Sequence, residues 1–161
     1  MCLIYSKKAT EEIKKSNRRV FTYYKVYSLR TYADGTYSIR SAIQTGTVAG
    51  TYDIKPNGVF THISDRDEKK LDSIELRSKT VSCGIHVYIN KADAEQYIEN
   101  SKKSFCWPLP LFYVPVKCFK NDLVAVGKWQ DKPHPPQAVF MKIQINTNAL
   151  IKAVNKRLGI K

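Results

Sequence analysis

The sequence lacks any apolar run near the ~18 residues that a membrane-spanning helix needs. It also lacks the order of segments in a secretory signal, because four apolar residues, Met1 to Ile4, come before the first charges at Lys7 and Lys8. A signal peptide places its charge first and follows it with a longer apolar stretch. We therefore expect a soluble cytoplasmic protein with no membrane partner.

Motifs of common enzymes and metal sites are missing as well. The chain has no GxSxG, P-loop or GxGxxG pattern, and its three histidines form no HxH or HExxH pair. None of the four cysteines belongs to a CxxC pair. Cys83 and Cys118 lie in apolar segments and are expected to be buried thiols. We expect no metal, no catalytic residue and no cofactor held by a standard motif.

Acidic residues are scarce, at 14 against 27 lysines and arginines, which gives a net charge of +13. The charge is concentrated at the two ends of the chain: residues 1–30 carry +6, residues 31–100 carry −2, and residues 101–161 carry +9. Such a field attracts phosphates and other anions. The alternative is ordinary solvated surface charge.

Hydrophobic patterning predicts an α+β fold in a single domain spanning 1–161. A basic N-terminal segment, 1–19, contains a short helix, and strands follow at 20–30 and 36–43. Asp34-Gly35 indicates a two-residue hairpin turn, which would place Tyr32 opposite Tyr37 and Arg30 opposite Ile39. Residues 65–80 are charged without a period, and we expect a mobile loop there.

The second half predicts strands at 81–89, 111–118, 123–129 and 138–145. Asn90 is placed to cap a helix, and a last helix begins near Thr147. Because strands and helices do not alternate regularly, we expect a mostly antiparallel sheet, continuous or split, with two to three helices.

Aromatic residues are interleaved with cations in the first strands. A base stacks on an aromatic ring while lysine and arginine neutralise its phosphates. The alternative is that these tyrosines line a core, since tyrosine favours strands. The densest group comprises Tyr24, Lys25, Tyr27, Arg30, Tyr32, Tyr37 and Arg40.

The stretch Gly84-Ile85-His86-Val87-Tyr88 followed by an alanine-containing helix resembles a group of small bacteriophage-encoded proteins of unassigned function. The opening Met1-Cys2-Leu3 and the strand Tyr24-Lys25-Val26 are similar to that group too. The resemblance implies a protein of the host cell cytoplasm with a role in counter-defence.

The same stretch, continued to Tyr97, also resembles the poly-ADP-ribose-polymerase branch of the ADP-ribosyltransferases. The resemblance implies that Tyr97 stacks on nicotinamide and that His62-Ile63-Ser64 matches an upstream His-Gly-Ser. The chain departs from the family pattern at two positions, where His86 replaces a tyrosine and Ala94 replaces a serine. The catalytic glutamate is also missing, because Gln137 or Ala138 stands at its position.

We interpret the chain first as a protein that captures a phosphate-bearing ligand without catalysis, either a nucleotide defence signal or a nucleic acid. One alternative is an ADP-ribosyltransferase-like enzyme that uses NAD or leaves an NAD-derived nucleotide bound. Another is an inhibitor of an acidic host protein. His86 and Tyr97 also have structural interpretations, as a strand histidine and a helix-face core residue. The candidate ligand-binding residues are His62, Ser64, His86 and Tyr97 for a closed pocket, and Arg18, Arg19, Arg30 and Arg40 for an extended surface.

Overall fold

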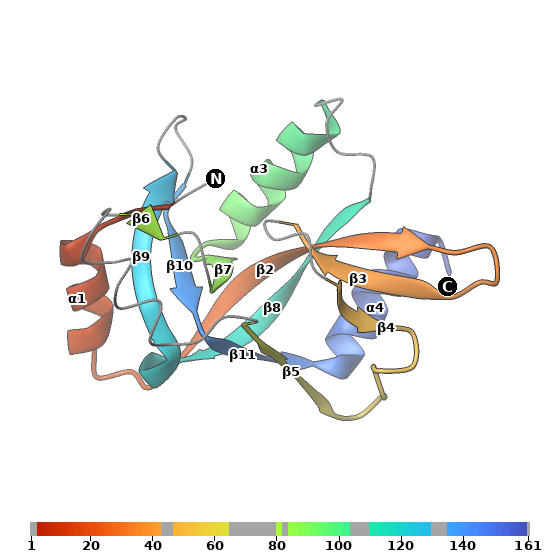
Figure 1. Cartoon of the computed structure of the whole chain (residues 1–161), viewed down its shortest axis with the longest axis horizontal. Helices are drawn as coiled ribbons and strands as arrows, with labels where there is room; N and C mark the ends of the chain where they lie inside the picture. Colours follow the sequence, from red (N-terminus) through yellow and green to blue (C-terminus); the bar gives the residue numbers. More distant parts are fainter. Residues whose placement is uncertain are drawn as a thin grey trace.

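The chain folds into three α-helices and a single curved sheet (Figure 1). The computed structural model describes residues 3–42, 47–64, 80–81, 84–103, 110–129 and 135–160. Within these residues, the strands form one eleven-stranded sheet, and every pairing in it is antiparallel. The α+β class and the antiparallel sheet expected from the sequence are confirmed. Residues 65–79, most of the expected mobile loop, lie outside the described residues, as does Cys83.

Sheet order differs strongly from chain order. The path runs β5-β11-β8-β2-β7-β10-β9-β1-β6, and β3 joins β2 to β4 as a side branch. The strands are β1 Leu3–Tyr5, β2 Val20–Thr31, β3 Tyr37–Ser41, β4 Thr47–Gly50, β5 Val59–Ile63, β6 Thr80–Val81, β7 Ile85–Tyr88, β8 Leu111–Phe119, β9 Leu123–Trp129, β10 Gln137–Phe140 and β11 Lys142–Asn146.

Each helix has identifiable end signals. In α1 (Lys7–Lys15) the Ser6 Oγ accepts from the backbone of Ala9, and in α4 (Thr147–Leu158) the Asn146 side chain accepts from that of Ala149. Gly159 ends α4 in the left-handed conformation. Asn90 precedes α3 (Lys91–Lys102), as expected, but its amide donates to the Asp93 carboxylate instead of capping the backbone.

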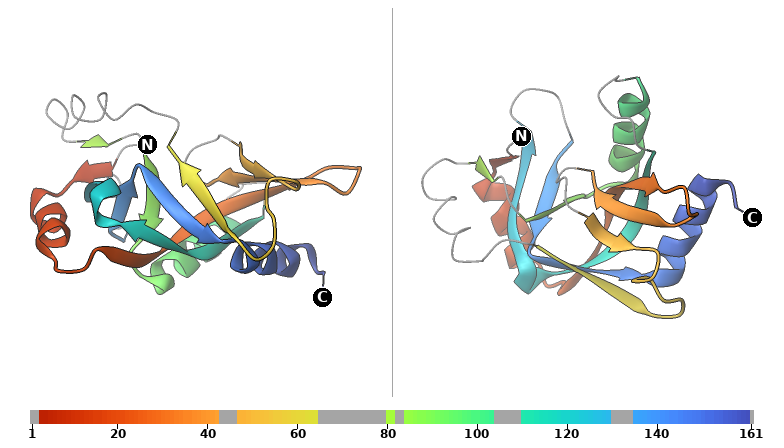
Figure 2. Two further views of the ribbon diagram at one scale, coloured as in Figure 1. Left: turned by 90° about the horizontal axis from the view of Figure 1, so that it is seen from below. Right: turned by 45° about the vertical axis from the view of Figure 1, so that its right-hand side comes forward.

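The long strand β2 organises the sheet. One of its edges pairs with β8 from Val20 to Ser28. Its other edge pairs with β7 at Tyr24 and then with β3 from Tyr27 to Thr31, so the sheet forks along this edge. Figures 1 and 2 show the outcome: α1 and β9 lie at one end of the molecule, and the β2–β3 hairpin extends at the other.

The two faces of β2 pack into different cores. Tyr23, Tyr27 and Leu29 face the main cluster, to which α4 contributes Leu150 and Val154. The opposite face, with Tyr24 and Val26, packs under α3. Apolar surface buried in these two clusters stabilises the packing of α4 and α3 on the sheet, at ~25 cal/mol per Å². The alternation of side chains along a strand accounts for the division.

The register of the β2–β3 hairpin differs from the one expected from the sequence. Leu29 lies opposite Ile39, Arg30 opposite Ser38 and Thr31 opposite Tyr37, one residue away from the expected pairs. The turn is one residue longer than expected: the Gly35 backbone donates to Tyr32, and Gly35 is left-handed at φ 82°. A three-residue loop that ends in a left-handed glycine is a common hairpin connection, and its extra residue shifts the register.

The expected strand at 138–145 is also wrong, because it is two strands. β10 pairs with β7 and β9, whereas β11 pairs with β5 and β8. Met141, between them, donates its backbone N–H to Asp122 and accepts from Ser64. Similarly, the expected strand at 81–89 is divided into β6 and β7. Gly84 precedes β7 at φ 87°, where a Cβ atom would lie 2.5 Å from the Val139 side chain.

Candidate functional site

A lysine fills the fork of the sheet. Lys25 lies between the Tyr24–Tyr88 pair on β7 and the Tyr27–Ser41 pair on β3. Its Nζ donates to the Oγ of Ser41 at 2.9 Å and to the backbone oxygen of His86 at 3.0 Å. Only 1% of Lys25 is exposed. The amine therefore joins two strands at the point where they diverge from β2.

Burial without a carboxylate changes the charge of this amine. Desolvation lowers the pKa of Lys25 to about 7, because an ammonium ion loses its hydration there. The Tyr27 ring lies 5.7 Å from Nζ and offers a weak cation–π contact. Near neutral pH the Lys25 site thus changes between a charged and a neutral amine.

His62 lies on the main-core side of the same region. Its Nδ1 shares a 3.0 Å hydrogen bond with the hydroxyl of Tyr27, whose ring it also contacts. Burial, reinforced by the charge of Lys25, lowers the pKa of His62 to about 3. The imidazole is neutral at pH 7, so it offers no charge to a phosphate.

His86 is 2% exposed on β7, opposite Val139 and beside the Trp129 ring. Burial, and then Lys25, lower its pKa to about 3. The nearby amide of the buried Gln137 shifts this pKa in the opposite direction, upward. Among the described residues, however, the two polar atoms of that amide and the Nδ1 of His86 have no partner that meets hydrogen-bond geometry. Gln137 and Ala138, at the position that the resemblance gives to a glutamate, are fully buried at the start of β10.

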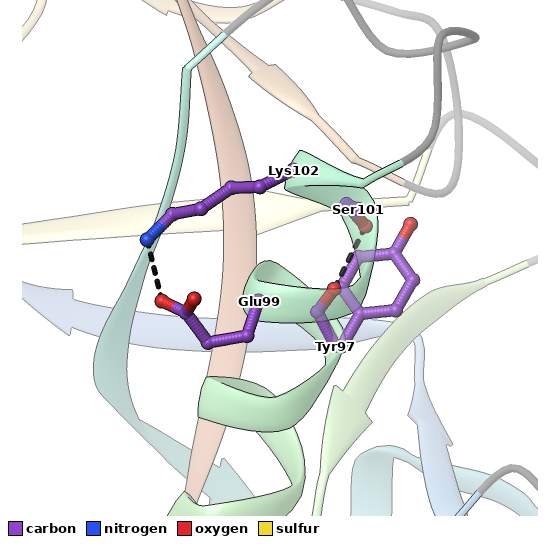
Figure 3. Close-up of polar contacts among 4 residues, drawn as sticks. All are labelled: Tyr97, Glu99, Ser101 and Lys102. Carbon is purple, nitrogen blue, oxygen red and sulfur yellow. Dashed lines mark hydrogen bonds and ion pairs between the residues drawn. The ribbon is translucent and has the colours of Figure 1, made fainter.

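Tyr97 belongs to a different part of the molecule. It projects from α3 and packs on the Tyr88 ring at 5.6 Å, in the cluster under that helix. Figure 3 shows its ring on one side of α3 and the Glu99–Lys102 ion pair on another. The charge of Lys25 thus affects both imidazoles, His62 lies at the main core beside Tyr27, and Tyr97 lies apart from His62 under α3.

Ser64 follows β5, where its backbone donates to Met141. Its buried hydroxyl reaches no hydrogen-bond partner among the described residues. Hence none of the four residues expected in a closed pocket contributes a positive charge at neutral pH.

Arg18 and Arg19 belong to a basic surface near the start of β2. Lys14 and Lys15 end α1, and the two arginines are exposed in the link to β2. Lys120 joins this link by donating its Nζ to Ser16 and its backbone N–H to Arg19. We define the basic surface as Lys14, Lys15, Arg18, Arg19, Lys117 and Lys120.

Lys117 completes the basic surface from β8, where it pairs with Thr22. The segments 13–22 and 115–121 that carry the surface contain no acidic residue. Asp122, in the same turn as Lys120, lies 4.0 Å from Lys142, and Glu11 and Glu12 stand one helical turn before Lys14 and Lys15 in α1. Six positive charges thus come from four segments: α1, the link to β2, β8 and the turn after β8. Lys117 and Lys120 reach this region through the pairing of β8 with β2 and the bonds of Lys120 to the link, which no sequence pattern predicts.

Arg30 and Arg40 occupy the far end of β2. Ten steps from Val20 to Arg30 at ~3.3 Å each put Arg30 roughly 33 Å from the start of β2, and Arg40 lies on β3 opposite Ser28. The neighbouring tyrosines differ in environment: Tyr27 is buried, Tyr24 and Tyr37 are half-buried, and Tyr32 is 44% exposed. Of the group expected to stack bases, Tyr32 is the most accessible.

Comparisons with known proteins give no family for the chain. No family model, no curated protein and no solved structure matches it. Across the described residues, no helix has the length and apolar character to cross a membrane, and no three metal-binding side chains gather. The function proposed below is therefore inferred from the geometry and charge of the chain itself.

Proposed function

We propose that this protein binds nucleic acid through phosphate contacts and performs no chemistry on it. The observation that carries the proposal is the basic surface, in which Arg18, Arg19 and Lys117 are exposed without a carboxylate in their segments. Phosphate contacts by lysine and arginine release counterions, which drives association. A closed nucleotide pocket around His62 and His86 is less well supported, because both imidazoles are neutral and buried at pH 7.

Part of this charge also has a structural use. Lys14 and Lys15 stand at the C-terminal end of α1, where cations interact favourably with the helix dipole. Lys120 satisfies the backbone oxygen of Ser16. Arg18 and Arg19 lie beyond the helix and on exposed backbone, so they are the residues whose charge is best explained by a ligand.

The test is the affinity for a labelled oligo-dT strand of about 20 nucleotides, measured by fluorescence anisotropy from about 50 to 200 mM salt. We expect Arg18→Glu/Arg19→Glu to weaken binding at least tenfold and to reduce the salt slope by about 1.4, since each single-strand phosphate contact contributes ~0.7. The matched control is Lys152→Glu/Lys156→Glu on exposed positions of α4, with the same change in net charge. We expect the control to lose less than threefold.

Two results contradict the proposal. Equal losses in both double variants would mean that only net charge matters. A wild-type chain that binds no DNA at the lowest salt, but retains an acidic protein in a pull-down after nuclease treatment, would support the inhibitor class instead. Circular dichroism of every variant verifies that the fold is intact.

A further inference from the structure

One face of the β2–β3 hairpin carries arginine and tyrosine side chains together. Strand pairing puts Ser28 opposite Arg40 and Arg30 opposite Ser38, and directly opposite residues share a face. Tyr32 lies two residues after Arg30 and has the same orientation. We call Arg30, Tyr32, Ser38 and Arg40 the Arg–Tyr platform.

The Tyr32 ring is held in place. Its hydroxyl lies 3.1 Å from the Oγ of the buried Ser38, and the Arg30 guanidinium lies 5.4 Å from the ring centroid. Tyr32 as a whole residue is nevertheless 44% exposed. An aromatic ring that is fixed before binding loses little side-chain entropy when a ligand stacks on it.

From these contacts we infer that the Arg–Tyr platform binds an unpaired base, with Tyr32 stacking on the base and Arg30 and Arg40 next to its phosphates. The inference rests on the proposed function and narrows its ligand to single-stranded nucleic acid. In a duplex the faces of the bases are stacked on one another, so a tyrosine at the surface reaches only the backbone. A single strand offers its base faces freely.

The two cationic sites lie on the same face of β2. Thr22, opposite Lys117 of the basic surface, lies on the same face of β2 as Arg30 and Tyr32, with α3 covering the strand between them. The two cationic sites lie at opposite ends of this one strand (Figure 1).

The experiment compares Tyr32→Ala with Tyr32→Phe on two probes, the labelled oligo-dT strand and its duplex with oligo-dA. We expect Tyr32→Ala to weaken single-strand binding between about 5-fold and 100-fold, as the loss of one stacked base does. Its salt slope and its duplex affinity stay at the wild-type values, because no charge is removed. Tyr32→Phe keeps the ring and stays within about threefold of wild type.

Tyr52→Ala is the matched control, since Tyr52 is 83% exposed on the turn after β4 and outside the platform. Tyr32→Ala that binds the single strand like wild type overturns the inference; if Arg18→Glu/Arg19→Glu still weakens binding, the proposed function stands. Equal losses on single strand and duplex overturn it too. A wild-type chain that binds neither probe rejects the inference and the proposed function together.

Discussion

The Nζ of Lys25 lies 2.9 Å from the Oγ of Ser41, across the point where β3 separates from β7. Ser41 is the last residue of β3 and His86 lies in β7, so one amine bonds to both branches of the sheet. A strand pair normally satisfies its own backbone oxygens. At the fork, the Nζ of Lys25 donates to the backbone oxygen of His86 the hydrogen bond that a neighbouring strand would otherwise donate.

This amine should make stability depend on pH above neutrality. Its folded pKa is about 7 against an ordinary 10.5, so between these values the unfolded chain holds a proton that the folded protein lacks. Stability then rises with pH, by ~1.4 kcal/mol per pH unit for one proton. We expect urea unfolding between pH 7.5 and 8.5 to show this rise in wild type and to lose it in Lys25→Met.

The exposed Lys152 supplies the control for that measurement, because Lys152→Met should keep the rise. The pH range stops below the region in which thiols and tyrosines ionise. Burial raises the pKa of the Cys118 thiol, raises that of Tyr23 to about 12 and raises that of Tyr27 further, so stability falls once these groups ionise in the unfolded chain. A Lys25→Met protein with the full wild-type rise would contradict the assignment.

The two buried histidines should dominate the response to acid. His62 and His86 have folded pKa values of about 3, and an unfolded histidine titrates near 6.5. As pH falls below 6.5 the unfolded chain gains two protons that the folded protein does not, and stability drops by ~2.7 kcal/mol per pH unit. We expect His62→Gln or His86→Gln to halve that slope between pH 6.5 and 5. An unchanged slope in both variants would refute this origin.

The docking of α1 on β9 should depend on one hydroxyl. Thr10 is fully buried, its Oγ1 donates to Ser6 at 2.8 Å, and it accepts from the backbone N–H of Val126 at 2.9 Å. Thr10→Val keeps the shape but leaves a buried N–H without its acceptor, which costs ~1–3 kcal/mol. Urea unfolding measures the loss. Thr22→Val, at an exposed position near the start of β2, should change stability by less than about 0.5 kcal/mol.

Most elements could be predicted from local signals. The apolar spacing of Leu150 and Val154 and the caps Ser6 and Asn146 depend on neighbours in the chain, and the helices begin where these residues indicate. The division of 137–146 at Met141 could not be predicted in this way. The pattern of apolar residues continues through Met141, and only the partners of β10 and β11 distinguish the two strands.

The candidate site shows the same division between local and distant information. Arg18 and Arg19 stand out as a basic pair in the sequence, but Lys117 and Lys120 join them through pairs nearly a hundred residues apart in the chain. The sequence groups Lys25 with the neighbouring tyrosines as a possible phosphate contact. Its burial follows from the fork, which depends on three strands meeting along one edge of β2.

The position of β2 also sets an order of events during synthesis. Its hairpin partner β3 is synthesised almost immediately after it, whereas β8, which pairs with nine of its residues, begins only after 79 intervening residues. Until then a long, aromatic-rich strand has one edge without its partner, a state that favours pairing with other chains. Loop closure over such a separation is slow. The pairing of β8 with β2 should therefore limit how fast the newly made protein covers this edge and stops being prone to aggregation.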